Sequence, residues 1–179
     1  KEIDYISDHY RTFIEKSPFV LLATSGPGGL DCSPRGDPAG FVRVADNKTV
    51  LLPDRRGNNR LDSLRNLVAD PRAALLFLIP GIGQTLRVNG RGTIVTEPGL
   101  LQSFAINGKT PASVIMIEVE TVYFQCPKAL VRSRLWAADT QIQPSELPTS
   151  GEILAALSAE IDGAEFDRNY PERLKQTIY

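Results

Sequence analysis

An unbroken apolar run at residues 73–79, Ala-Ala-Leu-Leu-Phe-Leu-Ile, restricts the fold of this chain more than any other segment. A strand with one face in water alternates apolar and polar side chains, and this run has no polar position. The segment is therefore expected to be a central strand that is covered on both faces. A central strand needs strands beside it, and the flanking segments have the composition to supply them.

The flanking segments resemble short strands joined by tight turns. Glycine and proline gather at 26–29 and 80–83, and the run 84–93 alternates apolar and polar residues. Helical spacing predicts peripheral helices, one over the first 16 residues with Ser7 as its candidate cap and another that begins near Arg60. A further helix is expected after Thr149, because the spacing of Thr149 and Glu152 resembles a capping box. The expected fold is mainly β, of the α+β class: a small antiparallel barrel of about six strands with helices around its rim. A doubly wound α/β fold is the alternative, but the first half of the chain does not alternate strand and helix.

With 179 residues, the chain has the length of a single domain. We expect an N-terminal helix in residues 1–17, a barrel core in 18–136, and a loop with helices in 137–179. The net charge of −1 disfavours a nucleic-acid binder, because such proteins usually carry a basic surface. Because the sequence begins at Lys1 rather than at a methionine, native residues that precede it are expected to be missing.

Cysteine and histidine are scarce, and this limits the chemistry that the chain can perform. The two cysteines, Cys32 and Cys126, form no C-x-x-C motif, and no signal peptide or long apolar span is visible, so a cytoplasmic location without a membrane is expected. The one histidine, His9, lies in the predicted N-terminal helix and is expected at the surface. Triads that need histidine, and most transition-metal sites, are therefore disfavoured. An enzyme of this composition would use a bound organic cofactor and no metal.

Residues 53–60, Pro-Asp-Arg-Arg-Gly-Asn-Asn-Arg, place three arginines within six residues between a predicted strand and a predicted helix. Guanidinium groups match phosphate oxygens, and the first turn of a helix adds free N–H groups. Asn59 is expected to cap the helix, with Asp62 at the third helical position as in a capping box. The loop is thus a candidate phosphate site, and a solvated basic loop is the alternative.

Three further clusters could contact a ligand. They are Ser33 with Arg35, the strand face that carries Gln84, Thr85 and Arg87, and the basic segment that carries Lys128, Arg132, Arg134 and Trp136. Each has an ordinary structural explanation, as a solvated arginine or a packing tryptophan.

The order of these segments resembles the pyridoxamine-phosphate-oxidase-like flavoproteins, which are FMN-binding split barrels. The resemblance is clearest in Asp-Pro-Arg-Ala-Ala-Leu-Leu-Phe at 70–77 and Leu-Arg-Val-Asn-Gly-Arg-Gly at 86–92, and it covers residues 19–136. Two further segments resemble a less characterised branch of this superfamily, whose members are described only as related to the oxidase. They are Cys-Ser-Pro-Arg-Gly-Asp at 32–37 and Cys-Pro-Lys-Ala-Leu-Val-Arg-Ser-Arg-Leu-Trp at 126–136. The resemblance implies an antiparallel FMN-binding split barrel and a homodimer with flavin between the subunits.

The resemblance also implies roles for particular residues. Those matching the ring and ribityl contacts are Ser33 and Arg35, and those matching the phosphate loop are Arg55, Arg56, Asn59 and Arg60. Thr85 and Arg87 match a strand that approaches the polar edge of the ring or the phosphate, and Lys128, Arg132, Arg134 and Trp136 would reach the flavin of the partner subunit. Arg35, Arg87 or Arg134 would supply a positive charge near the flavin N1.

The chain departs from the true oxidases at its C-terminus. Those enzymes use an arginine and histidine pair there to bind pyridoxamine phosphate, and this chain has no histidine after His9. The resemblance therefore implies an FMN-dependent oxidoreductase for another small molecule, with a nicotinamide as a candidate electron donor. The alternatives are a non-catalytic flavin-binding or sensing protein, a split barrel that holds deazaflavin or haem, and a structural dimer without a ligand.

Overall fold

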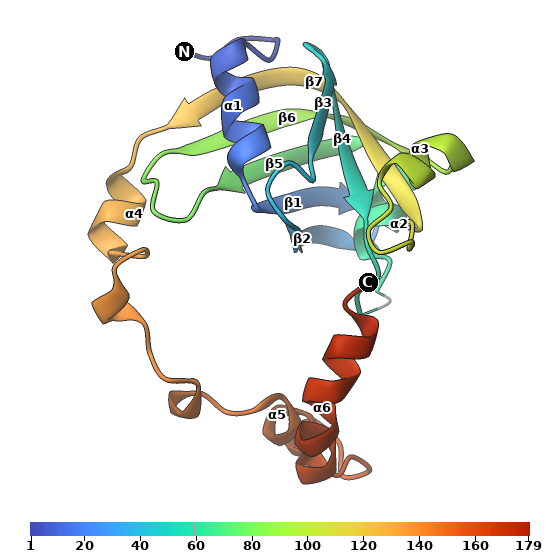
Figure 1. The fold of residues 1–179 in the computed structure, drawn as a ribbon, viewed down its shortest axis with the longest axis vertical. Helices are drawn as coiled ribbons and strands as arrows, with labels where there is room; N and C mark the ends of the chain where they lie inside the picture. The colour runs from blue at the N-terminus through green and yellow to red at the C-terminus, as the bar shows by residue number, and fades with distance from the viewer. Residues whose placement is uncertain (59) are drawn as a thin grey trace. The chain divides into compact units, whose positions relative to one another are not determined.

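The computed structural model describes residues 1–58 and 60–179, and it contains one seven-stranded antiparallel sheet (Figure 1). The strands follow the order β2-β1-β5-β6-β7-β4-β3. This is the predicted mainly β, antiparallel fold, with seven strands rather than about six. Residues 113–125 form one long strand. The bounds are β1 (Phe19–Gly26), β2 (Gly29–Gly36), β3 (Arg43–Asp46), β4 (Thr49–Asp54), β5 (Arg72–Leu78), β6 (Thr85–Val95) and β7 (Ser113–Gln125).

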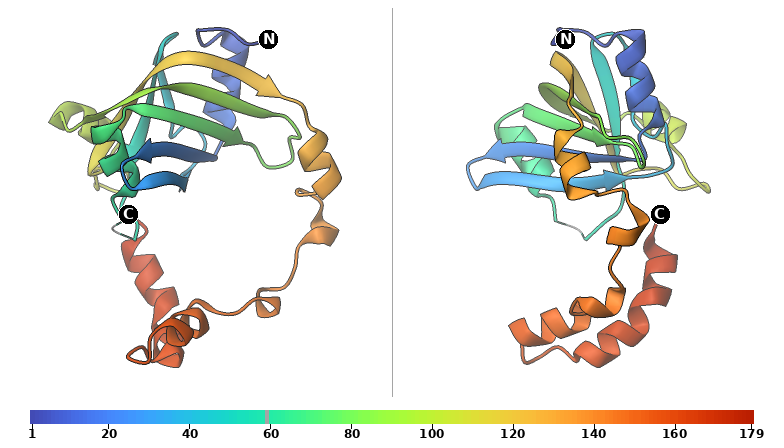
Figure 2. Two further views of the ribbon diagram at one scale, coloured as in Figure 1. Left: turned by 180° about the vertical axis from the view of Figure 1, so that it is seen from behind. Right: turned by 90° about the vertical axis from the view of Figure 1, so that its left-hand side faces the viewer.

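The two long strands β6 and β7 bend the sheet into a split barrel. They run together over most of their length (Figure 2), and β7 also pairs with β4 through its first half. Their register shifts between Asn89 and Gly90, where a Cβ atom on Gly90 would lie 2.0 Å from the carbonyl oxygen of Glu118. Glycine permits this close approach, which is typical of a β-bulge. Because β2 and β3 stand at opposite ends of the strand order, the sheet curls without closing.

The inward side chains of the strands form the hydrophobic core. Val20 and Leu22 of β1, Phe77 of β5 and Leu86 of β6 are all essentially buried. The outward side chains of β5, including Leu76, remain partly exposed. Residues 73–79 were expected to be covered on both faces. Within this chain only their inner face is buried.

Helices pack around the barrel as predicted. Helix α1 (Asp8–Lys16) places Tyr10 and Ile14 in the core, and the Oγ atom of Ser7 accepts a hydrogen bond from the Tyr10 N–H at its start. The helix is shorter than the predicted 16 residues, because Ile3 instead forms a backbone bridge with β7. The other helices of this part are α2 (Asp62–Ala69), α3 (Pro98–Ser103) and α4 (Lys128–Ser133).

The predicted capping box of α2 is not formed. The helix begins at Asp62, so this residue occupies the first helical position rather than the third. Leu61 stands at the N-cap and its side chain makes no capping hydrogen bond. Asn59, the predicted cap, lies outside the described residues. The first N–H groups of α2 therefore have no side-chain cap from the N-cap residue.

The chain divides into two compact units, Lys1–Trp136 and Ala137–Tyr179. The second contains short 3-10 turns at Ala138–Thr140 and Pro144–Glu146 and the helices α5 (Ser150–Leu157) and α6 (Gly163–Thr177). Helix α5 starts with the capping box predicted from Thr149 and Glu152. The two helices pack at Gly151, where a Cβ atom would lie 2.0 Å from the carbonyl oxygen of Gly163. Within residues 1–58 and 60–179, no helix has the length and apolar character needed to cross a membrane.

Candidate functional site

Polar side chains gather on the inner side of edge strand β2. Residues opposite one another in an antiparallel pair point to the same side of a sheet. Arg35 lies opposite the buried Val20, and Ser33 lies opposite the buried Leu22. Because side chains alternate, Asp31 and Asp37 share this inward side with Ser33 and Arg35.

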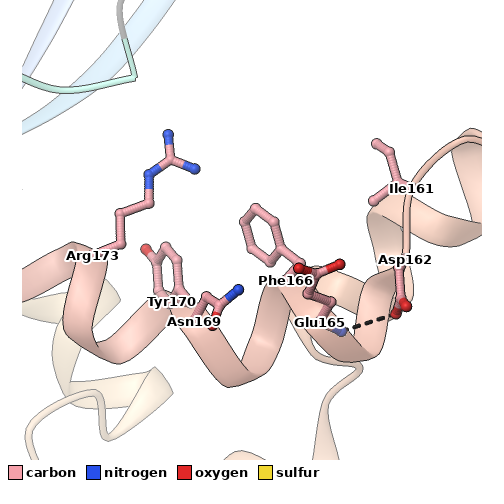
Figure 3. Close-up of a pocket in the computed structure, with 7 residues that line it drawn as sticks. All are labelled: Ile161, Asp162, Glu165, Phe166, Asn169, Tyr170 and Arg173. Atoms are coloured by element: carbon pink, nitrogen blue, oxygen red, sulfur yellow. Dashed lines mark hydrogen bonds between the residues drawn. The ribbon is translucent and has the colours of Figure 1, made fainter.

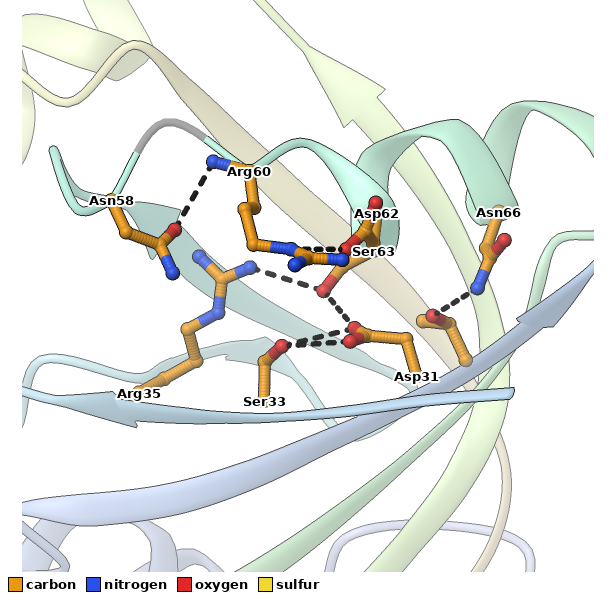
Figure 4. A network of polar contacts seen from close by, with 9 residues as sticks. Asp31, Ser33, Arg35, Asn58, Arg60, Asp62, Ser63 and Asn66 are labelled. Atoms are coloured by element: carbon orange, nitrogen blue, oxygen red, sulfur yellow. Dashed lines mark hydrogen bonds and ion pairs between the residues drawn. The ribbon is translucent and has the colours of Figure 1, made fainter. Parts of the chain in front are cut away.

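Arg35 connects β2 to β4 through Asp54, and to α2 through Ser63 (the contact with Ser63 is drawn in Figure 4). Its Nη1 atom donates to Oδ1 of Asp54 at 2.5 Å, and its Nη2 atom donates to Oγ of Ser63 at 3.3 Å. The side chains of Arg35 and Asp54 are 18% and 12% exposed. The Nε atom of Arg35 is buried, and no described residue accepts a hydrogen bond from it. Arg35 thus keeps one donor that the protein does not satisfy.

Ser33 and Ser63 extend this network through a carboxylate. The Oγ atom of Ser63 donates to Oδ2 of Asp31 at 2.5 Å, and the Oγ atom of Ser33 donates to the same carboxylate. Figure 4 shows Ser33 and Arg35 pointing from β2 toward the start of α2. The structure therefore brings Ser33, Arg35 and the start of α2 together.

Arg55, a predicted phosphate ligand, is already held inside the protein. Its Nε atom donates to Oδ2 of Asp37 at 2.7 Å, and its Nη1 atom donates to the carbonyl oxygen of Phe104 at 2.8 Å. The side chains of Arg55 and Asp37 are 16% and 2% exposed. In this arrangement Arg55 fixes the loop to β2 and to the end of α3.

The other two arginines of the loop face solvent. Arg56 is exposed, and Arg60 is exposed with its Nε atom 2.8 Å from Oδ2 of Asp62. Figure 4 shows Arg60 beside the start of α2. An ion pair at this level of exposure is weak, so Arg60 can exchange Asp62 for another anion.

Carboxylates balance the arginines at this end of the barrel. The sequence patterns nominated the arginines and missed their partners, since an aspartate on a strand has no distinctive spacing. Asp31, the carboxylate in β2, could have been nominated from the sequence, because two-residue alternation places its side chain on the same side of the strand as Ser33 and Arg35. A second missed residue is Ser113, whose Oγ atom is buried without a described partner and which pairs with Asp54 in the sheet. The four arginines Arg35, Arg55, Arg56 and Arg60 are matched in number by Asp31, Asp37, Asp54 and Asp62.

Thr85 and Arg87 lie on the other side of the sheet from Arg35. Their neighbours in β6, such as Leu86, point into the core, so these two side chains point outward. The Nη1 atom of Arg87 donates to the hydroxyl of Tyr123 at 2.8 Å, and Oγ1 of Thr85 donates to Oε1 of Gln125 at 3.1 Å. One flavin lying along the inner side of β2 would not meet them within the same chain.

Helix α4 and the residues after it form a third group. The indole N–H of Trp136 donates to the carbonyl oxygen of Ile82 at 2.9 Å, which leaves the ring partly exposed. Lys128 and Arg132 are exposed, and Arg134 ends the helix in a left-handed conformation with φ of 53°. The sequence-nominated residues are thus divided among three places on the barrel unit.

Other polar features involve none of these residues. Helix α6 carries a groove of about 250 Å³ lined by the stacked rings of Phe166 and Tyr170 and by Arg173, and no nominated residue lines it (Figure 3). A hydrogen bond from the Arg72 guanidinium is the main reason that the pKa of Asp70, after α2, lies well below its ordinary range. In the described part of the chain, no group of three or more His, Cys, Asp or Glu side chains is arranged to hold a metal ion.

Comparison with known proteins relates the barrel unit to one family. The family model described as pyridoxamine 5′-phosphate oxidase matches residues 6–126. The structure is similar to HupZ from Group A Streptococcus, with 17% sequence identity and a TM-score of 0.54, over 68% of this chain and 94% of that chain. It is also similar to a proposed pyridoxamine 5′-phosphate oxidase from Lactobacillus delbrueckii, with 15% identity and a TM-score of 0.53, over 68% of this chain and 95% of that chain. A comparison with curated proteins gives no match. The structural similarities confirm the predicted split-barrel fold.

Proposed function

The chain belongs to the pyridoxamine 5′-phosphate oxidase family, and from this premise we propose that it is a homodimeric FMN-binding oxidoreductase. The proposal covers a cytoplasmic protein that acts on a small molecule, with a nicotinamide as the candidate electron donor. Pyridoxamine phosphate oxidation is not proposed, because the chain has no histidine after His9 for the oxidase pair.

The observation that carries the proposal is the combination of arginine donors with the start of α2, where the N-cap residue Leu61 provides no side-chain acceptor. The Nε atom of Arg35 is buried and unsatisfied, Arg56 and Arg60 are exposed, and the N-cap side chain of α2 makes no hydrogen bond. Free helix N–H groups and guanidinium donors together favour a phosphate. We assign the FMN phosphate to this place, with Asn59 of the same loop, and the ribityl chain and ring to Ser33 and the inner side of β2.

The uncovered outer face of the sheet supports a homodimer. Leu21 of β1 and Leu76 of β5 are cross-strand neighbours on that face, and Phe19 is 36% exposed beside them. A second copy packed there would cover β5 on both sides, as its composition predicts. Thr85 and Arg87 lie on this same face, so we propose that they contact the flavin held by the partner subunit. We assign Lys128, Arg134 and Trp136 to the partner's flavin as well.

FMN, when bound, supplies two-electron chemistry at its ring, so the protein needs to bind, orient and stabilise charge. The arginine and helix donors hold the phosphate. A guanidinium near the ring, from Arg87 or Arg134, would stabilise the negative charge that forms on reduction. The hydrogen bond from Arg87 to the hydroxyl of Tyr123 suits this role, because it helps to orient the cation before the reaction.

The purified protein tests the proposal directly. Bound flavin gives a yellow protein with absorbance at about 375 and 450 nm. Bleaching of this absorbance by NADH or NADPH distinguishes an oxidoreductase from a passive flavin binder. Arg56→Ala with Arg60→Ala should weaken FMN binding by a few kcal/mol, at about 1.5–3 kcal/mol for each charge-assisted hydrogen bond. Arg65→Ala, which removes an exposed arginine of α2, is the matched control and should leave the affinity unchanged. A colourless protein that takes up no added FMN would refute the proposal.

A further inference from the structure

Two ion pairs join edge strand β2 to β4, two strands that the sheet order leaves without backbone pairing to each other. Arg35 of β2 meets Asp54 of β4, and Asp37, just beyond β2, meets Arg55, just beyond β4. The order of the charges is therefore crossed: the β2 side supplies the cation of the first pair and the anion of the second, and the β4 side supplies the reverse. Both pairs are largely buried, so removal of one partner would leave an uncompensated charge.

The two pairs differ in how completely their arginines are satisfied. Arg55 also donates to the carbonyl oxygen of Phe104, and the side chain of Asp37 is only 2% exposed. Arg35 keeps an unsatisfied Nε donor beside Ser63 and the start of α2. Only the Arg35 pair thus has both an unused donor and a neighbouring place where an anion is favoured.

An anion that binds the Arg35 guanidinium shares it with Asp54, which already accepts a hydrogen bond from Nη1. A phosphate with two negative charges and a carboxylate on the same guanidinium repel one another, and this repulsion is strong in a partly buried site. Phosphate binding therefore favours a state in which Asp54 has left Arg35. Arg55 faces no such exchange, because its donors are directed to Asp37 and Phe104.

We propose that Asp54 occupies the position of a ligand phosphate on Arg35 and is displaced when a phosphomonoester binds, whereas the Arg55–Asp37 pair holds the split together in both states. The inference depends on the proposed function only in taking that phosphomonoester to be FMN. Asp54 is then a residue that sets affinity: it keeps Arg35 neutralised in the free protein, and the anion must compete with it.

The test compares Asp54→Asn with Asp37→Asn, since asparagine keeps the size and one acceptor oxygen of each aspartate. Each variant and the wild type are titrated with sodium phosphate against sodium chloride of equal ionic strength, and the midpoint of urea unfolding reports binding. FMN affinity is measured separately by quenching of flavin fluorescence. Asp54→Asn is expected to bind both inorganic phosphate and FMN about tenfold tighter than the wild type, because a competing charge is gone. Asp37→Asn is expected to be less stable with unchanged affinity.

The outcomes separate the two proposals. An Asp54→Asn protein that binds phosphate no more tightly than the wild type overturns the exchange, even if FMN binds. If phosphate behaves as expected and FMN binds to none of the proteins, the exchange stands and the FMN proposal fails. Should Asp54→Asn not fold, a crystal structure of the wild type with bound phosphate decides the matter. Phosphate on Arg35 with Asp54 released supports the exchange, and an intact Arg35–Asp54 bond with phosphate elsewhere overturns it.

Discussion

Arg55 and Arg56 are adjacent in the sequence, but they occupy different physical environments. Arg55 is held by a buried carboxylate and a carbonyl oxygen, and Arg56 extends into solvent. Arg56 can reorganise around a ligand at little cost because it is exposed, whereas moving Arg55 would leave the carboxylate of Asp37 buried without a cation. The role of an arginine in this loop is therefore decided by its partner rather than by its position in the arginine-rich run.

Arg55→Ala is expected to destabilise the ligand-free protein by about 3–5 kcal/mol, because it leaves Asp37 buried without a cation. Urea unfolding followed by circular dichroism measures the change in the free energy of unfolding. Arg56→Ala is the control, with an expected change within about 0.5 kcal/mol for an exposed side chain. Equal effects of the two substitutions would show that the Arg55–Asp37 pair does not hold the loop.

Among the elements, β6 and β7 determine the shape of the barrel. They are the longest strands, and the register shift at Asn89 and Gly90 lets them bend while the ladder continues on both sides. Glu120 lies between the paired residues Val119 and Thr121 of β7 and is the extra residue of the bulge. The bend carries β4 away from β5 and toward β2, where the polar site forms.

Gly90→Ala should destabilise the protein by about 1–3 kcal/mol or more, because its Cβ atom would meet the carbonyl oxygen of Glu118 at 2.0 Å. Gly28→Ala is the matched control, since a Cβ atom there would have no heavy atom within 4 Å. Thermal unfolding of both variants provides the comparison. A Gly90→Ala protein as stable as the Gly28→Ala protein would mean that the bulge relaxes without cost.

Local patterns in the sequence predicted the elements well, and long-range contacts account for what they missed. Strand alternation in 84–93 and the capping signals at Ser7 and Thr149 depend on neighbouring residues, so they are readable from the chain. The start of α2 at Asp62, by contrast, depends on how the loop is fixed to distant residues. Similarly, no local signal indicated that Thr85 and Arg87 face away from Ser33 and Arg35, because this follows from sheet order.

At the scale of the whole molecule, the barrel unit leaves one sheet face without a covering layer. The outward residues of β1 and β5 are mostly apolar and partly exposed, among them Leu21, Leu76 and Leu78, and they continue into the polar row of Thr85 and Arg87. An apolar centre with a polar margin is the usual composition of a protein interface. A second copy of the chain would both complete the layers of the fold and bring the outward residues to a flavin.

Leu76→Glu is expected to convert a dimer into a monomer, because two carboxylates would face the apolar interface. Arg87, its cross-strand neighbour, should allow the substituted chain to stay folded. Light scattering coupled to gel filtration should give twice the 19.6 kDa chain mass for the wild type and the single mass for the variant. Val68→Glu, at an 80% exposed position on α2, should remain a dimer. A wild-type protein of single mass would refute the dimer.

The crossed order of the two ion pairs has a consequence for how the sheet ends find each other. If they met in another alignment, with Arg35 near Arg55 and Asp37 near Asp54, both contacts would repel. Only one alignment pairs each charge with its opposite. The ends of β2 and β4 therefore align by complementary charge within one chain, in the way that two separate proteins select a partner.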